Sequence, residues 1–223
     1  MNAVRPASAS AAAFGERLLV LDHPIVAHKM SILRDADTRP EQFRDAVRAL
    51  AMLEAYEATR DLPTEAVRVD TPLAPAACRR IPDDALAVVP ILRAGMGMLE
   101  GVLSAVPSAA VGVLGMERDE RTHIPREYYA KMPSGIQDRR VLLIDPMLAT
   151  GGSATAALSH VRASGVRDCT LLVLVAAPQG VRAVLDADAE VRIVTCALDD
   201  GLNEDAYIVP GLGDAGDRIF GTL

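Results

Sequence analysis

One stretch of the chain combines an acidic side chain with a turn of small residues. The apolar residues 141–144 lead directly into Asp145, and the turn Thr-Gly-Gly-Ser follows at 150–153. An Ala-rich pattern with one apolar face then predicts a helix over 153–163. A strand, an acid, a small-residue turn and a helix start form an anion site, because free backbone N–H groups and the positive helix end point at the ligand. The stretch predicts a phosphate-binding loop; an ordinary capped strand-to-helix turn is the alternative.

The loop lacks the marks of two common phosphate-binding motifs. No Lys follows the glycines, as it would in a Walker loop, and the GxGxxG spacing of dinucleotide folds is absent. The run DPMLATGGS at 145–153 instead resembles the signature with which type I phosphoribosyltransferases bind 5-phospho-α-D-ribose 1-diphosphate (PRPP). In that family acids hold the ribose hydroxyls and the turn holds the 5′-phosphate. Two adjacent acids are usual there; Pro146 in the second position resembles the branch that acts on uracil.

A second stretch, residues 89–95, places Arg93 where a predicted strand ends in Arg-Ala-Gly. In a parallel sheet this Arg would face the same crevice as Asp145, and its planar fork suits phosphate oxygens. A surface Arg at a strand end is the alternative. On the family resemblance the segment is the pyrophosphate-binding loop, which makes Arg93 the candidate for gripping the leaving diphosphate.

The third stretch, residues 115–132, is a long polar connection that carries Arg118. Such connections in compact domains are usually lids or disordered. On the resemblance this is a flexible hood over the diphosphate, and Arg118 matches a substrate-contacting Arg. Glu117 stands where relatives often have an aromatic residue. Tyr128 and Tyr129 are interpreted as packing residues of the lid or of a subunit contact.

The glycine-rich C-terminal segment 201–222 is the fourth stretch. Its run YIVPGLGDAGD at 207–217 resembles the base-binding segment of the uracil-specific enzymes. Fixed backbone N–H and C=O groups can read the carbonyls and ring N–H groups of uracil, and an unmatched buried amide is costly. The resemblance implies that the base is contacted by Ile208, Gly213, Asp214 and Ala215, and that Asp214 also reaches PRPP or its metal.

The rest of the chain predicts an α/β fold, with a doubly wound, parallel, five-stranded sheet. Five continuously apolar runs are typical of strands covered on both faces: 85–92, 109–116, 141–144, 171–177 and 191–198. Helical patterns at 96–103, 153–163 and 180–187 alternate with them. An N-terminal helical segment is expected before the sheet: a solvated helix at 25–34, then a packing helix to about Thr59 that opens with a Thr38–Glu41 capping box. The Pro-rich residues 61–84 predict loops and at most a short edge hairpin.

Composition makes several classes of function less favoured. The chain has 223 residues and a formal net charge of −7, which disfavours capture of nucleic acid or of an anionic membrane. Cys78, Cys169 and Cys196 lack CxxC spacing and predict buried thiols in a cytoplasmic protein. Residues 1–17 are expected to be a disordered leader, and residues 18–223 a single domain.

The resemblance covers about nine-tenths of the chain and implies uracil phosphoribosyltransferase chemistry: uracil and PRPP give UMP and diphosphate, a pyrimidine salvage step. Mg²⁺ would bind mainly through PRPP, near Asp214, without a dedicated protein site. The implied PRPP-binding residues are Arg93, Arg118, Asp145, Pro146, Met147, Leu148, Ala149, Thr150, Gly151, Gly152, Ser153 and Asp214; Asp145, Arg93 and Arg118 would be catalytic.

The family also implies a homo-oligomer, a dimer or tetramer, and GTP as an effector, with His28, Lys29 and Arg34 as candidate effector or interface residues. Two alternatives stay open. One is a phosphoribosyltransferase for another base. The other is a non-catalytic regulator of the same fold that binds RNA.

Overall fold

The computed structural model describes residues 12–118 and 125–222. These residues form 22 helices and strands. The helices are η1 (Ala12–Arg17), α2 (Pro24–Arg34), α3 (Pro40–Ala58), α4 (Met96–Ala105), η2 (Ile136–Asp138), α5 (Gly152–Ala163), α6 (Pro178–Ala187) and α7 (Ala215–Phe220). The strands of the main sheet are β1 (Leu18–Val20), β4 (Leu86–Leu92), β5 (Ala110–Val111), β6 (Val113–Arg118), β7 (Pro125–Lys131), β8 (Arg140–Ile144), β10 (Cys169–Val173) and β12 (Arg192–Thr195). Three smaller pairs are β2 (Glu65–Asp70) with β3 (Pro75–Arg80), β9 (Met147–Leu148) with β11 (Val175–Ala176), and β13 (Gly201–Leu202) with β14 (Ile208–Val209).

The main sheet has eight strands in the order β1-β12-β10-β8-β4-β6-β7, with β5 also beside β4. Its pairings are parallel except that of β6 with β7. The α/β class with a parallel centre is as predicted, and the five apolar runs form that centre. The sheet is wider than the predicted five strands because β1 and β7 extend its edges and one run divides into β5 and β6.

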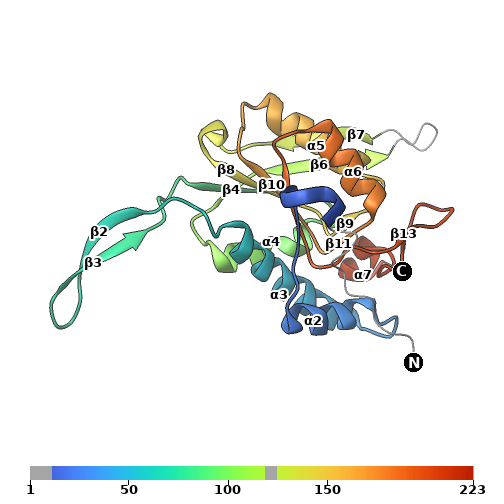
Figure 1. The fold of residues 1–223 in the computed structure, drawn as a ribbon, viewed down its shortest axis with the longest axis horizontal. Coiled ribbons are helices and arrows are strands. Elements are labelled where there is room, and N and C mark those ends of the chain that lie inside the picture. Colours follow the sequence, from blue (N-terminus) through green and yellow to red (C-terminus); the bar gives the residue numbers. More distant parts are fainter. Residues whose placement is uncertain (1–11, 119–124, 223) are drawn as a thin grey trace.

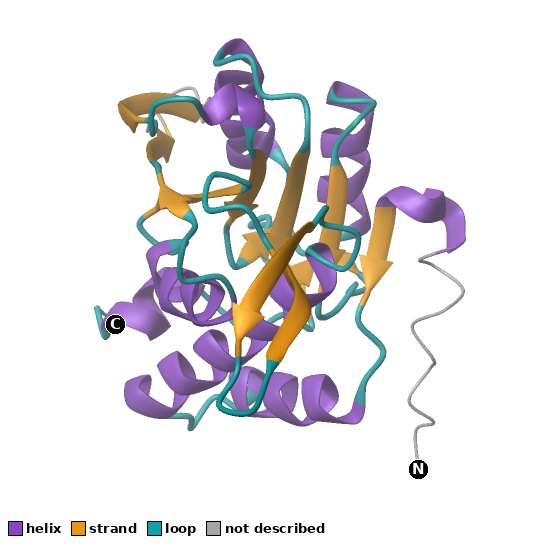
Figure 2. Cartoon of the chain, turned by 90° about the vertical axis from the view of Figure 1, so that its left-hand side faces the viewer, coloured by secondary structure: helices purple, strands orange, loops and turns teal. Residues whose placement is uncertain are grey.

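Helices cover both faces of the sheet (Figure 1). Neighbouring residues of β4 show the division: Val88 belongs to the core beneath α2, α3, α4 and α7, whereas Val89 belongs to the core beneath α5 and α6. Successive strand side chains point to opposite faces, so a continuously apolar strand fills both cores. Figure 2 shows the helical layers flanking the strands. The doubly wound arrangement leaves the carboxyl ends of the strands free to carry a site.

A two-stranded hairpin of β2 and β3 projects from the body (Figure 1). It replaces the loops and short edge hairpin predicted for the Pro-rich segment, and it does not extend the main sheet. Most of its residues are exposed, and Leu73 near its tip is 97% exposed. Cys78 lies in β3 and is exposed, so the prediction of three buried thiols is wrong for this one; Cys169 and Cys196 are buried.

Three other local expectations differ from the structure. The expected leader already contains η1, whose Arg17 donates to the Leu185 and Asp188 carbonyls at 3.1 Å, whereas residues 1–11 lie outside the described part. The predicted capping box does not form, since Thr38 Oγ1 donates to the Ile32 carbonyl and α3 starts at Pro40. The connection 115–132, expected to be a polar loop, is largely the hairpin of β6 and β7; residues 119–124 lie outside the description.

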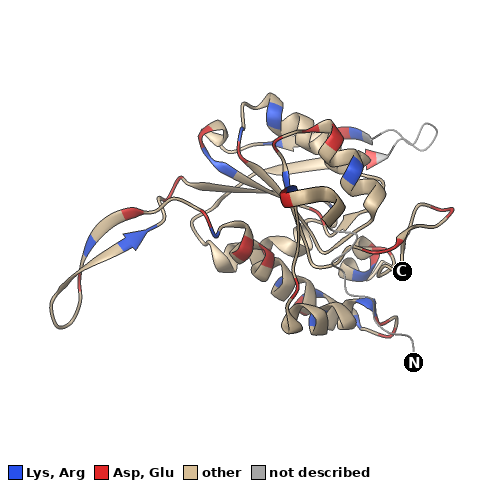
Figure 3. Cartoon of the chain, in the orientation of Figure 1, with Lys and Arg blue, Asp and Glu red and all other residues tan. Residues whose placement is uncertain are grey.

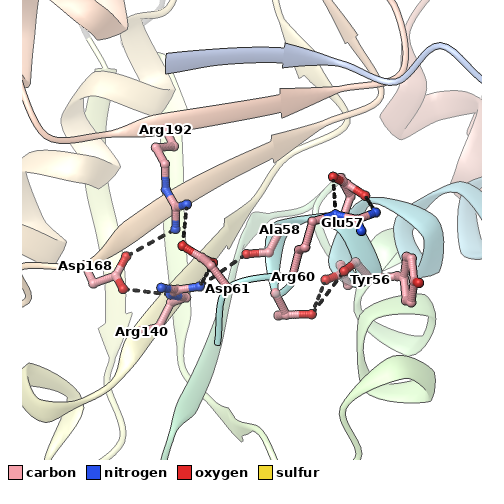
Figure 4. Close-up of polar contacts among 10 residues, drawn as sticks. Tyr56, Glu57, Ala58, Arg60, Asp61, Arg140, Asp168 and Arg192 are labelled. Atoms are coloured by element: carbon pink, nitrogen blue, oxygen red, sulfur yellow. Dashed lines mark hydrogen bonds and ion pairs between the residues drawn. The ribbon is translucent and has the colours of Figure 1, made fainter. Parts of the chain in front are cut away.

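An ion-pair network ties the amino ends of the central strands together (Figure 4). Arg140, at the start of β8, donates to Asp61 at 2.5 Å and to Asp168 at 2.7 Å. Arg192, at the start of β12, donates to Asp61 at 3.2 Å. The guanidinium of Arg140 lowers the pKa of Asp61. This network therefore stabilises the edge of the sheet opposite the carboxyl ends of the strands.

The described helices include none that is long and apolar enough to cross a membrane. Figure 3 shows Lys and Arg interspersed with Asp and Glu over the helices.

Candidate active site

A cavity of about 450 Å³ opens at the carboxyl ends of β4 and β8. Three segments that are far apart in the sequence supply its walls: the loop after β4, the loop after β8, and the C-terminal segment. The lining residues are Arg93, Ala94, Asp145, Met147, Leu148, Ala149, Thr150, Gly151, Gly152, Ser153, Ala154, Asp205, Ala206, Tyr207, Ile208, Gly213, Asp214, Ala215 and Gly216. The polar groups predicted from sequence thus converge on one concave site.

The loop 147–153 forms a cradle at the start of α5. Gly151 is the N-cap of this helix with φ 86°, a left-handed conformation that glycine adopts without cost. A Cβ on Gly151 would lie 2.9 Å from the Ala183 Cβ and from the Gly180 carbonyl, so α6 backs the turn closely. The first N–H groups of α5 have no partner within the helix. With the positive end of the helix, they can bind an anion in the cavity.

Asp145 immediately follows β8 at the floor of the cavity. Its backbone N–H donates to the Leu172 carbonyl at 3.1 Å, and Met147 N donates to Asp145 Oδ1 at 3.5 Å. The pKa of Asp145 is raised to about 7, mainly by burial; the Met147 hydrogen bond opposes the rise and the nearby charge of Asp214 adds to it. A carboxyl group with such a pKa is poised between its two protonation states near neutral pH, a perturbation typical of functional sites.

Arg93 reaches the cavity from the loop after β4, where the Leu92–Arg93 peptide bond is cis. A Cβ on Gly95 would lie 2.4 Å from the Ile144 carbonyl, so only glycine lets this loop press against the end of β8. The Arg93 side chain is 64% exposed, lies 3.9 Å from Asp217 Oδ1, and sits over the Phe220 ring at 5.8 Å. An exposed guanidinium at the cavity rim can engage a second anionic group.

The C-terminal segment closes the opposite wall with backbone groups. The antiparallel β13–β14 pair holds Ile208, which is buried, beside the cavity. Gly213, at φ 78°, and Asp214 follow, and Asp214 caps α7 by accepting from Asp217 N at 2.9 Å. Main-chain amides and carbonyls fixed in this way can read the edge of a small planar ligand.

Of the predicted site residues whose side chains the structure describes, Pro146 does not line the cavity. Pro146 is buried, and its carbonyl accepts from the N–H groups of Leu174 and Val175 at 3.1 and 3.2 Å, so it holds the loop to β11. Arg118 is the last residue of β6, and the placement of its side chain lies outside the description.

The lining also contains residues that the sequence prediction left unassigned. Ala94 and Gly216 adjoin assigned residues, and their small size in the RAG and DAG triplets was the available signal. The turn of residues 205–207 carries no composition signal. Its backbone places it at the cavity: Ala206 has φ 63°, and the Asn203 side chain accepts from Tyr207 N at 2.8 Å.

Comparison with known proteins identifies the family. The family model described as uracil phosphoribosyltransferase matches residues 20–222. The chain belongs to that family. It is 56% identical over 206 residues to the uracil phosphoribosyltransferase of Symbiobacterium thermophilum, covering 92% of this chain and 99% of that protein. The uracil phosphoribosyltransferase of Latilactobacillus sakei is 51% identical over the same shares of the two chains.

A solved structure has a similar fold over nearly the whole chain. The AQ2163 protein from Aquifex aeolicus superimposes with a TM-score of 0.87 at 36% identity, covering 91% of this chain and 97% of that one. With family membership shown over nearly the whole chain, its reaction is that of a pentosyltransferase that converts uracil and PRPP to UMP and diphosphate in pyrimidine salvage.

Proposed function

We propose that the cavity between the cradle, Arg93 and the C-terminal segment is where uracil and PRPP react. The observation that carries this proposal is the convergence on one cavity of the loop 147–153, at the start of α5, and of residues 208 and 213–215 of the C-terminal segment. A substrate with a phosphate at one end and a planar base near the other needs both surfaces, separated by little more than a ribose. Asp145 lines the same cavity as both surfaces.

The proposed roles follow from the chemistry of each wall. Residues 149–153 hold the 5′-phosphate through backbone N–H groups, and Asp145 accepts hydrogen bonds from the ribose hydroxyls. Arg93 binds the diphosphate, whose charge grows as it leaves. Arg118 is assigned to the same diphosphate on the family resemblance alone.

The base is read by the main chain of the C-terminal segment. Ile208 packs against the ring of uracil, while backbone groups of 213–215 face its carbonyl and N–H edges. A base with a different pattern of donors and acceptors would leave a backbone group unpaired, which supports selection against cytosine.

In the reaction the C1′–oxygen bond to the diphosphate breaks, the N1–C1′ bond forms, and the N1 proton leaves with the products. The transition state carries positive charge on the ribose, so the enzyme contributes positioning and fixed charges more than a strong nucleophile. Ionised Asp145, through its proposed hydrogen bonds to the ribose hydroxyls, would stabilise that charge. Closing the cavity excludes the water that would otherwise hydrolyse PRPP.

Mg²⁺ is the proposed cofactor, bound mainly through PRPP. Asp145 and Asp214 offer hard oxygen donors in the cavity, which suit this ion. Within residues 12–118 and 125–222, no three His, Cys, Asp or Glu side chains are grouped so as to hold a metal ion by themselves. Diphosphate and ribose oxygens would complete the shell. When bound, the ion neutralises the leaving diphosphate.

We further propose that the chain forms a homo-oligomer, a dimer or tetramer. The projecting hairpin supports this, because an isolated two-stranded hairpin is marginally stable in water and an exposed Leu at its tip suits an apolar partner surface. Activation by GTP stays a prediction from the resemblance, tested by adding GTP to the assay below. The cytoplasmic location also stays a prediction.

The test is a radiolabel assay with purified protein, Mg²⁺ and PRPP, with uracil, cytosine, orotate and hypoxanthine as parallel substrates. The expected product is UMP from uracil alone, with a large loss of rate in Asp145→Asn. Thr71→Ala in the hairpin, far from the cavity, is the control and should retain full activity. Product from uracil that is unaffected by Asp145→Asn would overturn the proposed ribose role.

A further inference from the structure

The side chain of Arg34, at the end of α2, joins the C-terminal segment to the body of the protein. Its Nη2 donates to Asp199 Oδ1 at 2.6 Å, and its Nη1 donates to Asp199 Oδ2 at 2.8 Å. The same Nη1 also donates to the Gly211 carbonyl at 2.8 Å. Asp199 Oδ2 in turn accepts from Gly211 N at 2.8 Å. The ion pair therefore holds both main-chain polar groups of Gly211.

The Arg34–Asp199 ion pair is largely buried, so its charges must be well paired. The side chain of Asp199 is 5% exposed and that of Arg34 is 28% exposed, so the pair is largely removed from water. A buried carboxylate is tolerated only when its oxygens are paired, and two-pronged Arg–carboxylate contacts are the most directional of such pairs. Asp199 is fixed to the sheet as well, since its N–H donates to the Ala176 carbonyl at 2.9 Å. The pair therefore connects the backbone of Gly211 to β11 in the core.

Gly211 stands between the two parts of the segment that line the cavity, Ile208 and Gly213. Its φ is 61°, and a Cβ there would lie 2.1 Å from the Ile208 carbonyl, so the chain turns back on itself at this residue. Arg34, Asp199 and Gly211 are absent from the lining. Any influence of the ion pair on the ligand therefore passes through the backbone on either side of Gly211.

Arg218 fastens the same turn from its other side. Its Nη1 donates to the carbonyls of Leu212, at 2.8 Å, and Leu33, and its Nη2 donates to the Asp35 carbonyl at 2.5 Å. The guanidinium lies 4.4 Å above the Phe43 ring. The end of α2 is thus connected to residues 211 and 212 by two Arg side chains.

From these contacts we infer that the Arg34–Asp199 ion pair is a positioning device for uracil binding: it sets the backbone of 208–213, on either side of Gly211, that reads the base. This inference rests on the proposed base-binding role of that segment. Main-chain groups cannot rotate independently, as side chains can, to compensate for a displacement of the turn. A small displacement therefore weakens all the hydrogen bonds to the base together. The PRPP cradle lies on other elements, α5 and β9, and the described side-chain hydrogen bonds of Arg34 and Asp199 go to each other and to Gly211, not to the cradle.

The test compares steady-state kinetics of Arg34→Lys with those of a matched control, Arg162→Lys. Lys keeps the charge and loses the planar fork. Arg162 makes an equivalent two-pronged pair with Asp188, at 2.6 and 3.0 Å, and also donates to the Val166 carbonyl, at the far end of α5 from the cavity. Its side chain is 22% exposed and that of Asp188 is 11% exposed, so burial is similar.

The expected result is a rise of about tenfold or more in KM for uracil in Arg34→Lys, with KM for PRPP changed by less than about twofold. Asp199→Asn should act in the same direction. Arg162→Lys should leave both KM values near those of the unaltered protein. An unchanged KM for uracil in Arg34→Lys, or equal rises in both KM values, would overturn the inference, because a merely structural role predicts no selective effect.

A third variant, Ile208→Ala, distinguishes failure of this inference from failure of the proposal that the C-terminal segment binds uracil. Ile208 lines the cavity itself, so its truncation tests the base-binding assignment directly. If Ile208→Ala raises KM for uracil and Arg34→Lys does not, the segment binds the base and the positioning inference fails. If neither variant raises it, the base-binding assignment fails first.

Discussion

The thiol of Cys196 donates a hydrogen bond to Glu54 Oε1 at 3.3 Å, within the core between α3 and the end of β12. Glu54 is fully buried, and its second oxygen, Oε2, has no hydrogen-bond partner in the described protein. Burial raises the pKa of Glu54 to about 8 and, with the carboxyl group beside it, raises that of the Cys196 thiol. Near neutral pH the acid is therefore mostly protonated, which avoids an unpaired charge in the core.

This pKa predicts how stability depends on pH. The folded-state pKa of Glu54 lies above its ordinary value of 4.5, so its contribution to stability is full below that pH and is lost as pH rises through about 8. Over this interval the group lowers the free energy of unfolding by at most about 1.4 kcal/mol per pH unit. Glu54→Gln, which mimics the neutral acid, should remove this contribution from the slope measured in urea unfolding experiments and leave that of other groups, such as Asp145, whose pKa is also raised.

Glu57→Gln, one turn further along α3, is the control. Arg60 lowers the pKa of Glu57 through a hydrogen bond, so Glu57 does not titrate in this interval and its variant should keep the slope. Equal slopes in Glu54→Gln and the unaltered protein would contradict the prediction.

A second prediction concerns the pH dependence of PRPP use. Burial and the nearby Asp214 raise the pKa of Asp145 to about 7, and the ionised form is the one that accepts hydrogen bonds from ribose hydroxyls. The value of kcat/KM for PRPP, which reports groups of the free enzyme, should therefore rise with pH through about 7. Asp214→Asn should move this midpoint to lower pH, because it removes the neighbouring negative charge. An unchanged midpoint would refute the coupling.

Asp145→Asn tests the assignment of that midpoint. The variant should lower kcat/KM by about 10- to 100-fold, the effect of one hydrogen bond to a charged group, and its profile should lose the rise near neutral pH. A variant that keeps the rise would show that another group titrates.

The sheet centre and most of the cavity were predictable because their signals are local. A buried parallel strand reads as a continuous apolar run, and the cradle, Arg93 and the C-terminal segment each occupy a few consecutive residues. The prediction also placed Arg93 and Asp145 at one sheet edge, since the carboxyl ends of parallel strands meet there. The convergence of these two residues on one cavity follows from topology, whereas the C-terminal segment was assigned by its resemblance.

The missed features depend on contacts between residues that are distant in sequence. The partner of Arg34 lies 165 residues away, and nothing around Asp199 announces the pair. Read alone, α2 looked like a solvated helical face, although Val26, Met30 and Leu33 are buried. Glu54 did carry a signal, because it falls at i+4 from Leu50 on the apolar face of α3. Hairpin β2–β3 was obscured by prolines, one of which lies within β3.

A third prediction tests the cradle turn with a matched pair of glycines. Gly151 has φ 86° and no room for a Cβ, whereas Gly135 has φ 70° with nothing within 4 Å of its ideal Cβ position. Replacing either glycine by Ala costs about 1–2 kcal/mol for the left-handed backbone. Gly151→Ala must also displace the turn from α6, so its KM for PRPP should rise about tenfold or more.

Gly135→Ala should lose stability without a change in that KM, because it precedes η2 outside the cavity lining. Thermal unfolding measures the loss of stability that the two variants share. Initial rates at varied PRPP concentration measure the difference between their KM values. Equal KM values in the two variants would argue against phosphate binding by the turn.

The last prediction concerns self-association through the hairpin. Leu73 is 97% exposed on an arm whose two strands pair only with each other, and this exposed apolar side chain is the basis of the proposed contact with another copy of the chain. Leu73→Glu should shift the sedimentation coefficient towards that of a monomer, since burying a charge at an interface is costly. Ile25→Glu, a similar change at a 53% exposed position on α2, should leave association unchanged. If Leu73→Glu sediments as the unaltered protein does, the arm is not the contact, and Phe220, 43% exposed beside the cavity, becomes the next residue to vary.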